Sequence, residues 1–300
     1  MDQRAIGWSG SEEPDAEPNE RGAANGVAAL AAHGADVAAR APGLARPEAV
    51  ALAGAPGAGA VQPPPVDRGD MIGALNEVLD LDPRRTAVIT IDCQRGHLDL
   101  AVATMPVAPQ AAASLVASTA RLLRHARAWG MSVVHVVSQN RILPIGQPEA
   151  LCNPFWAAVE STRHSLTPER ESAMSRHNLV GTVQTQLMPE LGPEPGDVIV
   201  DRKRRLSIFH GTDLEITLHE LGIDTVVLAG VDTNAAVLCA AFESLNRDLQ
   251  TVVISDCVRS THGDDLHFFA LQNIARCLGW VLTVDGLAAK VARTQAAAAR

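Results

Sequence analysis

Short apolar runs separated by helical patterns constrain the fold of this chain more than any other feature. Thr86–Asp92 and Asp224–Ala229 are apolar almost throughout, which is typical of strands that are buried on both faces of a sheet. Joined by helices, such strands form parallel sheets through crossover connections. We therefore predict an α/β fold, a three-layer sandwich around a mainly parallel, six-stranded, Rossmann-like sheet. The predicted strands are Thr86–Asp92, Met131–Val137, Asp197–Asp201, Asp224–Ala229, Leu249–Ser255 and Trp280–Val284. Helical periodicity predicts helices over Met71–Leu81, Ala108–Trp129, Gly211–Leu221, Thr233–Asn246 and Asp264–Cys277.

The first 68 residues differ in composition from the rest of the chain. Residues 2–20 are acidic and polar, and residues 22–65 are dominated by Ala, Gly and Pro. Few large side chains could be buried there to offset the entropy of ordering the chain. We predict that 1–68 is a disordered extension, with an oligomerisation arm as the alternative, and that 69–300 is the folded domain. Within this domain, 138–180 contains four prolines and is predicted to be a long loop or lid.

Composition excludes several classes of protein. The 300-residue chain has a net charge of −9 and no basic stripe, so we predict that nucleic acid is not its partner. No apolar run reaches 18 residues, so no membrane span is expected. The N-terminus lacks the pattern of a signal peptide. The five cysteines form no CxxC pair, which is typical of reduced thiols, and we predict a cytoplasmic location.

Three positions fall at the carboxyl ends of predicted strands, where open parallel sheets bind their ligands. Asp92 ends the first strand, Lys203 follows the third, and Ala236 lies in the turn after the fourth. A buried carboxylate beside a cation can act as a general acid and base. Backbone N–H groups at the start of a helix can stabilise an oxyanion. These residues supply what a thiol-dependent amidase needs, except the sulfur.

Three motifs around these positions resemble the isochorismatase-like cysteine hydrolases. Ile91-Asp92-Cys93-Gln94 matches I-D-x-Q, and the stretch from Lys203 to Phe209 matches K-x-R-x-S-x-F. The stretch from Gly230 to Val237 matches G-V-x-T-[ND]-x-C-V, except that Ala236 stands where the family carries its catalytic cysteine. The similarity runs from about residue 84 to 287, in the family's order and spacing. It implies an isochorismatase-like fold and a small-molecule amide substrate.

The resemblance also implies roles for particular residues. Asp92 would be the acid and base, Lys203 would support it, and the N–H groups of Asp232 and Ala236 would form the oxyanion hole. It implies a cis peptide bond before Asp232 and a homodimer or homotetramer. Candidate substrate contacts lie after strand ends, in the motifs or in the predicted lid, and they are His97, Gln139, Asn140, Arg141, Trp156, His177, Thr233 and Phe209. Nicotinamidase-like members carry a D-x-H metal site that residues 137–141 lack, so we predict no metal and no cofactor.

Ala236 leaves three hypotheses open. The alanine could be an engineered replacement in an amidohydrolase that acts on a small amide or carbamoyl compound. It could be native to an enzyme that cleaves an enol ether, as true isochorismatases do, without needing a cysteine. The chain could also be a binding homologue without catalysis, because a fold alone does not establish activity. Cys239, three residues later, could replace the nucleophile, but we predict that it is a core thiol.

Overall fold

The structure, a computed structural model, describes residues 66, 68–141, 154–155 and 176–298. Contacts divide the chain into two units, Met1–Val66 and Asp67–Arg300, and the second contains nearly all of the described residues. The predicted disorder of 1–68 lies almost entirely outside the described residues. The same holds for most of the predicted lid over 138–180.

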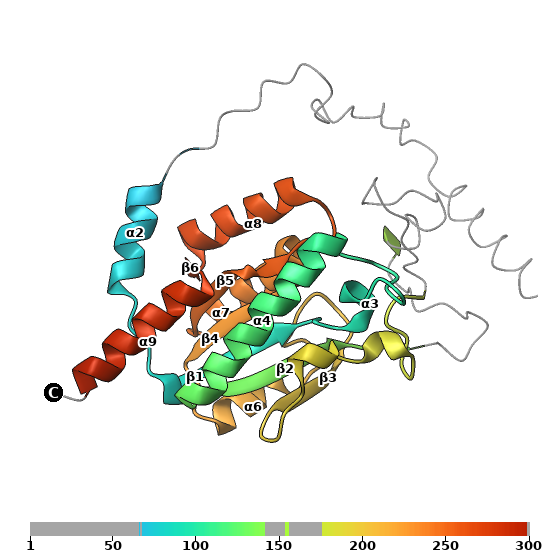
Figure 1. Cartoon of the computed structure of the whole chain (residues 1–300), viewed down its shortest axis with the longest axis horizontal. Helices are drawn as coiled ribbons and strands as arrows, with labels where there is room; N and C mark the ends of the chain where they lie inside the picture. Colours follow the sequence, from blue (N-terminus) through green and yellow to red (C-terminus); the bar gives the residue numbers. More distant parts are fainter. Residues whose placement is uncertain (1–65, 67, 142–153, 156–175, 299–300) are drawn as a thin grey trace, which may run out of the picture. The chain divides into compact units, whose positions relative to one another are not determined.

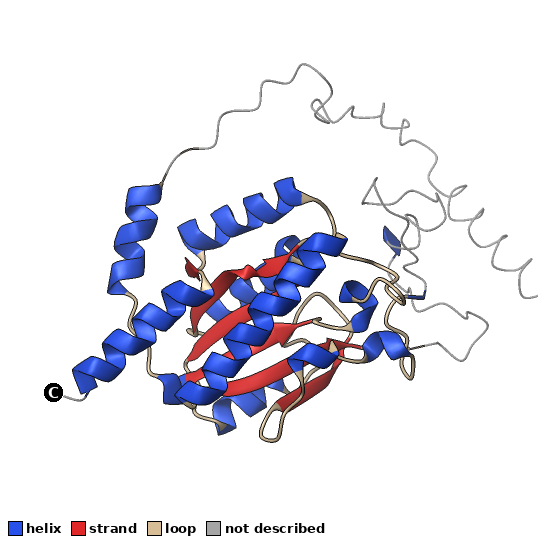
Figure 2. Cartoon of the chain, in the orientation of Figure 1, coloured by secondary structure: helices blue, strands red, loops and turns tan. Residues whose placement is uncertain are grey.

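The second unit is built on one sheet of six parallel strands, as the sequence predicts (Figure 2). The strands are β1 (Thr86–Ile91), β2 (Ser132–Ser138), β3 (Val198–Lys203), β4 (Thr225–Val231), β5 (Gln250–Arg259) and β6 (Trp280–Leu282). Their order is β3-β2-β1-β4-β5-β6. The chain therefore builds outward from β1 in one direction and from β4 in the other. This reversal lies between β1 and β4, where open α/β sheets bind their ligands.

Helices cover both faces of the sheet and complete the three layers (Figure 1). On one face lie α4 (Pro109–Trp129) and α9 (Val284–Ala298), and their apolar residues join one core cluster. On the other face lie α6 (Leu214–Glu220), α7 (Leu238–Leu245) and α8 (Asp264–Cys277), which join a second cluster. Neighbouring strand residues alternate between the two cores: Val88 faces the first, and Ile89 faces the second. Burial on both faces explains why the strand sequences are continuously apolar.

Two further helices lie before and after β1. Gly69–Val78 forms α2, where the sequence predicts Met71–Leu81, and Arg95–Leu98 forms α3. Over the described ranges, every helix is too short or too polar to cross a membrane.

Most predicted boundaries differ from the structure by one to four residues, and two regions differ more than that. The helix predicted over Thr233–Asn246 begins with a π-helical turn at Thr233–Val237, before α7. The last strand, predicted to extend to Val284, ends at Leu282, and the helix α9 that follows it was not predicted. There the Thr283 hydroxyl accepts a hydrogen bond from the Gly286 N–H at 3.1 Å and so caps the new helix.

Candidate active site

Asp92 and Ala236 follow the two strands that flank the reversal in strand order. The backbones of these strands come very close at Gly230 of β4. A Cβ added there would lie 2.0 Å from the carbonyl oxygen of Ile91 in β1, so a larger residue would collide with β1. Gly230 also has a φ of 121°, which favours glycine. Asp92 has a φ of 52°, and its N–H donates to the Val136 carbonyl at 2.9 Å. Such a left-handed conformation in a non-glycine residue costs free energy and is typical of functional sites.

The Asp92 carboxylate forms a buried ion pair with Lys203. Its Oδ2 lies 2.6 Å from the Lys203 Nζ, and the two residues are only 4% and 3% exposed. Ser138, at the end of β2, lies between them. Its hydroxyl donates to Asp92 Oδ1 at 2.7 Å and accepts from Lys203 Nζ at 3.0 Å. The ends of three adjacent strands thus meet in one hydrogen-bonded group.

Gln94 holds the backbone of Ser138 in place. Its side-chain amide donates to the Ser138 carbonyl at 3.0 Å, and its side-chain oxygen accepts from the Ser138 N–H. Gln94 belongs to the I-D-x-Q motif, but no role was predicted for it, and Ser138 was not among the predicted site residues. Ser138 directly follows the predicted strand Met131–Val137, and a polar residue at the carboxyl end of a strand could have indicated a place in the site.

The turn after β4 is tied to the segment that follows β5. The Asp232 carboxylate accepts from the Thr261 N–H at 2.7 Å, and the Asn234 side-chain oxygen accepts from the Ser260 hydroxyl at 2.7 Å. The Thr233 hydroxyl and His267 Nδ1 are 2.8 Å apart. The peptide bond between Val231 and Asp232 is cis.

Ala236 lies in apolar surroundings within this turn. It is 3% exposed and belongs to the core cluster that also contains Phe209 and Ile91. A side chain at position 236 is therefore buried in the same apolar core as Ile91, the last residue of β1.

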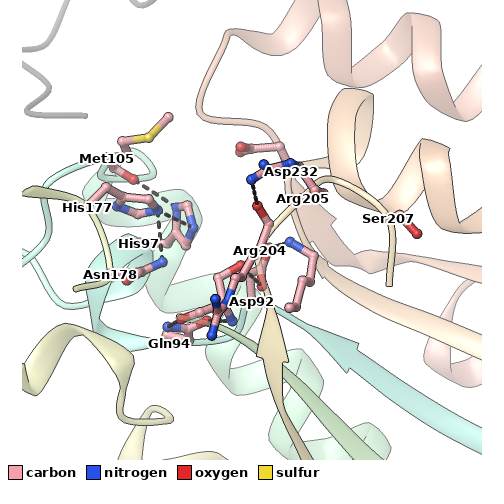
Figure 3. A network of polar contacts seen from close by, with 12 residues as sticks. Asp92, Gln94, His97, Met105, His177, Asn178, Arg204, Arg205, Ser207 and Asp232 are labelled. Atoms are coloured by element: carbon pink, nitrogen blue, oxygen red, sulfur yellow. Dashed lines mark hydrogen bonds and ion pairs between the residues drawn. The ribbon is translucent and has the colours of Figure 1, made fainter. Parts of the chain in front are cut away.

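A pair of histidines faces the same region. The Nε2 atoms of His97 and His177 are 3.1 Å apart, and the rings meet edge to face. His177 also contacts the Thr104 hydroxyl at 2.9 Å and the Asn178 side-chain amide at 2.8 Å. Burial lowers the pKa of His177 well below its usual range, and the charges of His97 and Lys203 lower it further. Figure 3 shows the histidines on one side of Asp92 and Asp232 on the other.

The remaining candidate contacts have different surroundings. The Gln139 N–H donates to the Lys203 carbonyl at 2.9 Å, and the Asn140 amide donates to the His177 carbonyl at 2.9 Å. Phe209 is buried, with the Arg247 guanidinium 4.1 Å from its ring centre. Arg141 is exposed. Trp156 lies outside the described residues.

Two cysteines near the site differ in their burial. Cys239, predicted to be a core thiol, is only half-buried; burial still raises its pKa, and the Glu243 carboxylate adds to the effect. Cys93 is fully buried in the core cluster on the α4 side, the face opposite Ala236. Burial raises the pKa of Cys93 far above its usual range, and the Asp92 carboxylate raises it further. Neither thiol has the lowered pKa of an activated nucleophile.

No group of three or more His, Cys, Asp or Glu side chains that could hold a metal ion occurs among the residues with described positions. The absence of a metal and of a cofactor stays a prediction.

Comparison with known proteins identifies the family. The Isochorismatase domain matches residues 86–286, so the chain belongs to the isochorismatase family, as the motifs predict. It is 30% identical over 231 residues to the ureidoacrylate amidohydrolase RutB of Methylobacterium radiotolerans, covering 72% of this chain and 83% of the relative. It is 29% identical over 184 residues to the maleamate amidohydrolase of Pseudomonas putida, covering 60% and 75%. An isochorismatase family protein from Burkholderia thailandensis has a similar structure, with a TM-score of 0.54, 29% identity, and coverage of 71% of this chain and 97% of that one.

Proposed function

We propose that this site hydrolyses a C–N bond, other than a peptide bond, in a small amide or carbamoyl compound. We further propose that Ala236 occupies the nucleophile position, so that the chain as it stands binds such a compound with very little turnover. The observation that carries the proposal is the buried Asp92–Lys203 pair at the reversal in strand order. The relatives named ureidoacrylate amidohydrolase and maleamate amidohydrolase support the same class of reaction.

The buried pair favours catalysis over a purely structural role. Removing two charges from water costs several kcal/mol each, and the attraction between them often does no more than offset that cost. Apolar side chains of similar size would stabilise the sheet at least as well. A carboxylate within 2.6 Å of an ammonium and 2.7 Å of a hydroxyl is instead suited to taking up and returning a proton.

With a cysteine at position 236, the reaction would proceed as follows. Asp92 takes the thiol proton, and the Lys203 charge favours the thiolate. The thiolate attacks the carbonyl carbon, and the N–H groups of residues 232 and 236 stabilise the oxyanion. The C–N bond breaks as Asp92 returns the proton to the departing ammonia. Asp92 then activates water, which hydrolyses the thioester and regenerates the thiol.

A second candidate reaction needs no sulfur. In an enol-ether hydrolysis of the isochorismatase type, Asp92 would protonate the substrate and water would attack the resulting cation. The alanine at position 236 is the observation that favours it, because nothing at that position would then need to act as a nucleophile.

Ammonia release by Ala236→Cys separates these proposals. The panel contains small amides, ureas and carbamoyl compounds, including ureidoacrylate and maleamate, and each is tested with the unchanged chain alongside. Ala235→Cys is the matched control, because it places a thiol one residue away in the same turn. We expect ammonia from Ala236→Cys alone. If neither that variant nor the unchanged chain releases ammonia, the amide proposal is wrong, and pyruvate release from isochorismate tests the second reaction.

The proposed enzyme is a cytoplasmic homodimer or homotetramer. Light scattering of the purified chain tests the oligomeric state directly.

A further inference from the structure

A cavity lies at the β3 edge of the sheet. Its volume is about 400 Å³, and it is lined by Arg141, Arg202, Arg204, Arg205, His210 and Gly211. It is formed by the end of β3, the turn that precedes α6, and a residue that follows β2. None of its lining residues is Asp92, Lys203 or Ala236, and of the candidate substrate contacts predicted from the sequence it contains Arg141. Figure 3 shows the hydrogen bond from the Arg205 guanidinium to the Arg204 carbonyl.

The positive charge in this cavity is poorly neutralised. In the part of the chain that the structure describes, the four arginines make one ion pair, in which Arg202 Nε lies 3.9 Å from the Asp201 carboxylate. Both partners are largely exposed, so this contact contributes little. The Arg205 guanidinium donates to the Arg204 carbonyl at 2.8 Å and not to a carboxylate. Such a concentration of cations is unusual in a chain with a net charge of −9.

The arginines also repel one another. Partial burial lowers the pKa of Arg204, and the charges of Arg141, Arg202 and Arg205 lower it further. A bound anion would relieve this repulsion.

Ser207 fixes the part of the turn that carries His210. Its hydroxyl accepts from the N–H groups of Phe209 and His210 at 3.1 and 2.7 Å, and it donates to Glu243 on α7 at 2.6 Å. The backbone at His210, on one side of the cavity, is therefore anchored to α7. A preorganised backbone lowers the entropy that a ligand must overcome on binding.

We propose that this cavity binds a small molecule that carries two or more anionic groups, either carboxylates or phosphates. Guanidinium groups form paired, charge-assisted hydrogen bonds with both. The volume lies in the range of small-molecule pockets, and the net negative charge of the protein disfavours a long nucleic acid.

Isothermal titration of the unchanged chain tests the proposal. The probes are inorganic pyrophosphate, propane-1,2,3-tricarboxylate and acetate. We expect at least one polyanion to bind about 10-fold or more tightly than acetate, with an affinity that falls as salt rises. The polyanion that binds with the lower Kd shows whether the cavity prefers phosphate or carboxylate groups. Absence of binding by both polyanions would overturn the proposal.

Two matched double variants locate the site. Arg141→Gln/Arg204→Gln should weaken polyanion binding about 10-fold or more, because two charge-assisted contacts are lost. Arg84→Gln/Arg276→Gln removes the same charge from exposed positions at the opposite ends of the strands and should leave affinity within about 2-fold. Equal losses in both variants would show only a general effect of net charge and would also overturn the proposal. Because the unchanged chain is used, failure here is independent of the proposed hydrolysis.

Discussion

The contacts of Ser138 with Asp92 and Lys203 were not predicted from the sequence and became evident only in the structure. Asp92 and Lys203 were predicted from their places after strands and from their motifs. The Ser138 hydroxyl reaches Asp92 across 46 residues of sequence, and its backbone is held by Gln94 across 44. Likewise, His97 and His177 were separate candidates, and their contact across 80 residues was not predicted. Pairings of this kind depend on strand order, which local patterns do not specify.

The role of Ser138 can be measured in an Ala236→Cys background. Ser138→Ala should lower kcat about 10-fold or more while changing KM little, because the hydroxyl orients Asp92 and Lys203 for proton transfer. Ser114→Ala, an exposed serine on α4, is the matched control and should change neither constant. An unchanged kcat in Ser138→Ala would remove Ser138 from the site.

The ion pair itself gives a stability prediction. Lys203→Met leaves the buried Asp92 carboxylate without its cation and should destabilise the fold by about 3–5 kcal/mol. Asp92→Asn/Lys203→Met removes both charges and should be destabilised less than Lys203→Met alone. Arg85→Met breaks an exposed pair with Asp224 and should cost less than about 1 kcal/mol. Urea denaturation of all three variants measures these differences, and a double variant less stable than Lys203→Met would contradict the prediction.

At the scale of elements, the sequence predicted strands better than helix ends. Apolar runs predicted all six strands, and the signal is strongest for the four central ones, β1, β2, β4 and β5, which are buried on both faces, whereas the edge strand β3 is largely exposed. The π-helical turn at Thr233–Val237 was not predicted, because its side chains bond to the β5–α8 segment and not to their own helix. The helix α9 was missed because its Thr283 cap was interpreted as part of a strand.

The close approach of β1 and β4 can be tested at Gly230. Gly230→Ala should destabilise the fold by about 3 kcal/mol or more, because its Cβ would collide with the Ile91 backbone and its φ disfavours other residues. Gly73→Ala, in α2 with open space around it, should be neutral or stabilising by up to about 1 kcal/mol. Thermal unfolding of both variants gives the comparison, and similar stabilities would show that the strands can separate without cost.

At the scale of the whole molecule, pH should act through histidines that are partly or fully buried. His177 is held neutral in the folded state, whereas in the unfolded chain it titrates near its ordinary pKa of about 6.5. Below that pH the unfolded state binds more protons, so stability falls as pH falls. The loss of stability through His177 ends only when the pH is below the lowered pKa that His177 has in the folded state. His135 and His267 act in the same direction, because burial lowers the pKa of each.

The contribution of His177 follows from the slope of stability against pH. The free energy of unfolding should fall less steeply between pH 6.5 and 5 in His177→Gln than in the unchanged chain, by up to about 1.4 kcal/mol per pH unit. His219→Gln, at an exposed position on α6, provides the control and should leave the slope nearly unchanged. Urea denaturation at several pH values measures both slopes, and equal slopes for His177→Gln and the unchanged chain would refute the prediction.

The apolar surroundings of Ala236 also bear on how such proteins diverge over generations. Replacing the residue at position 236 leaves no hydrogen-bonding atom without its partner, whereas replacing Asp92, Lys203 or Ser138 disrupts the other two. Under the proposed function, a lineage could give up or recover the sulfur without rebuilding the rest of the sheet. Two descendants would then share one architecture and one binding site and differ only in whether the bound molecule is released intact.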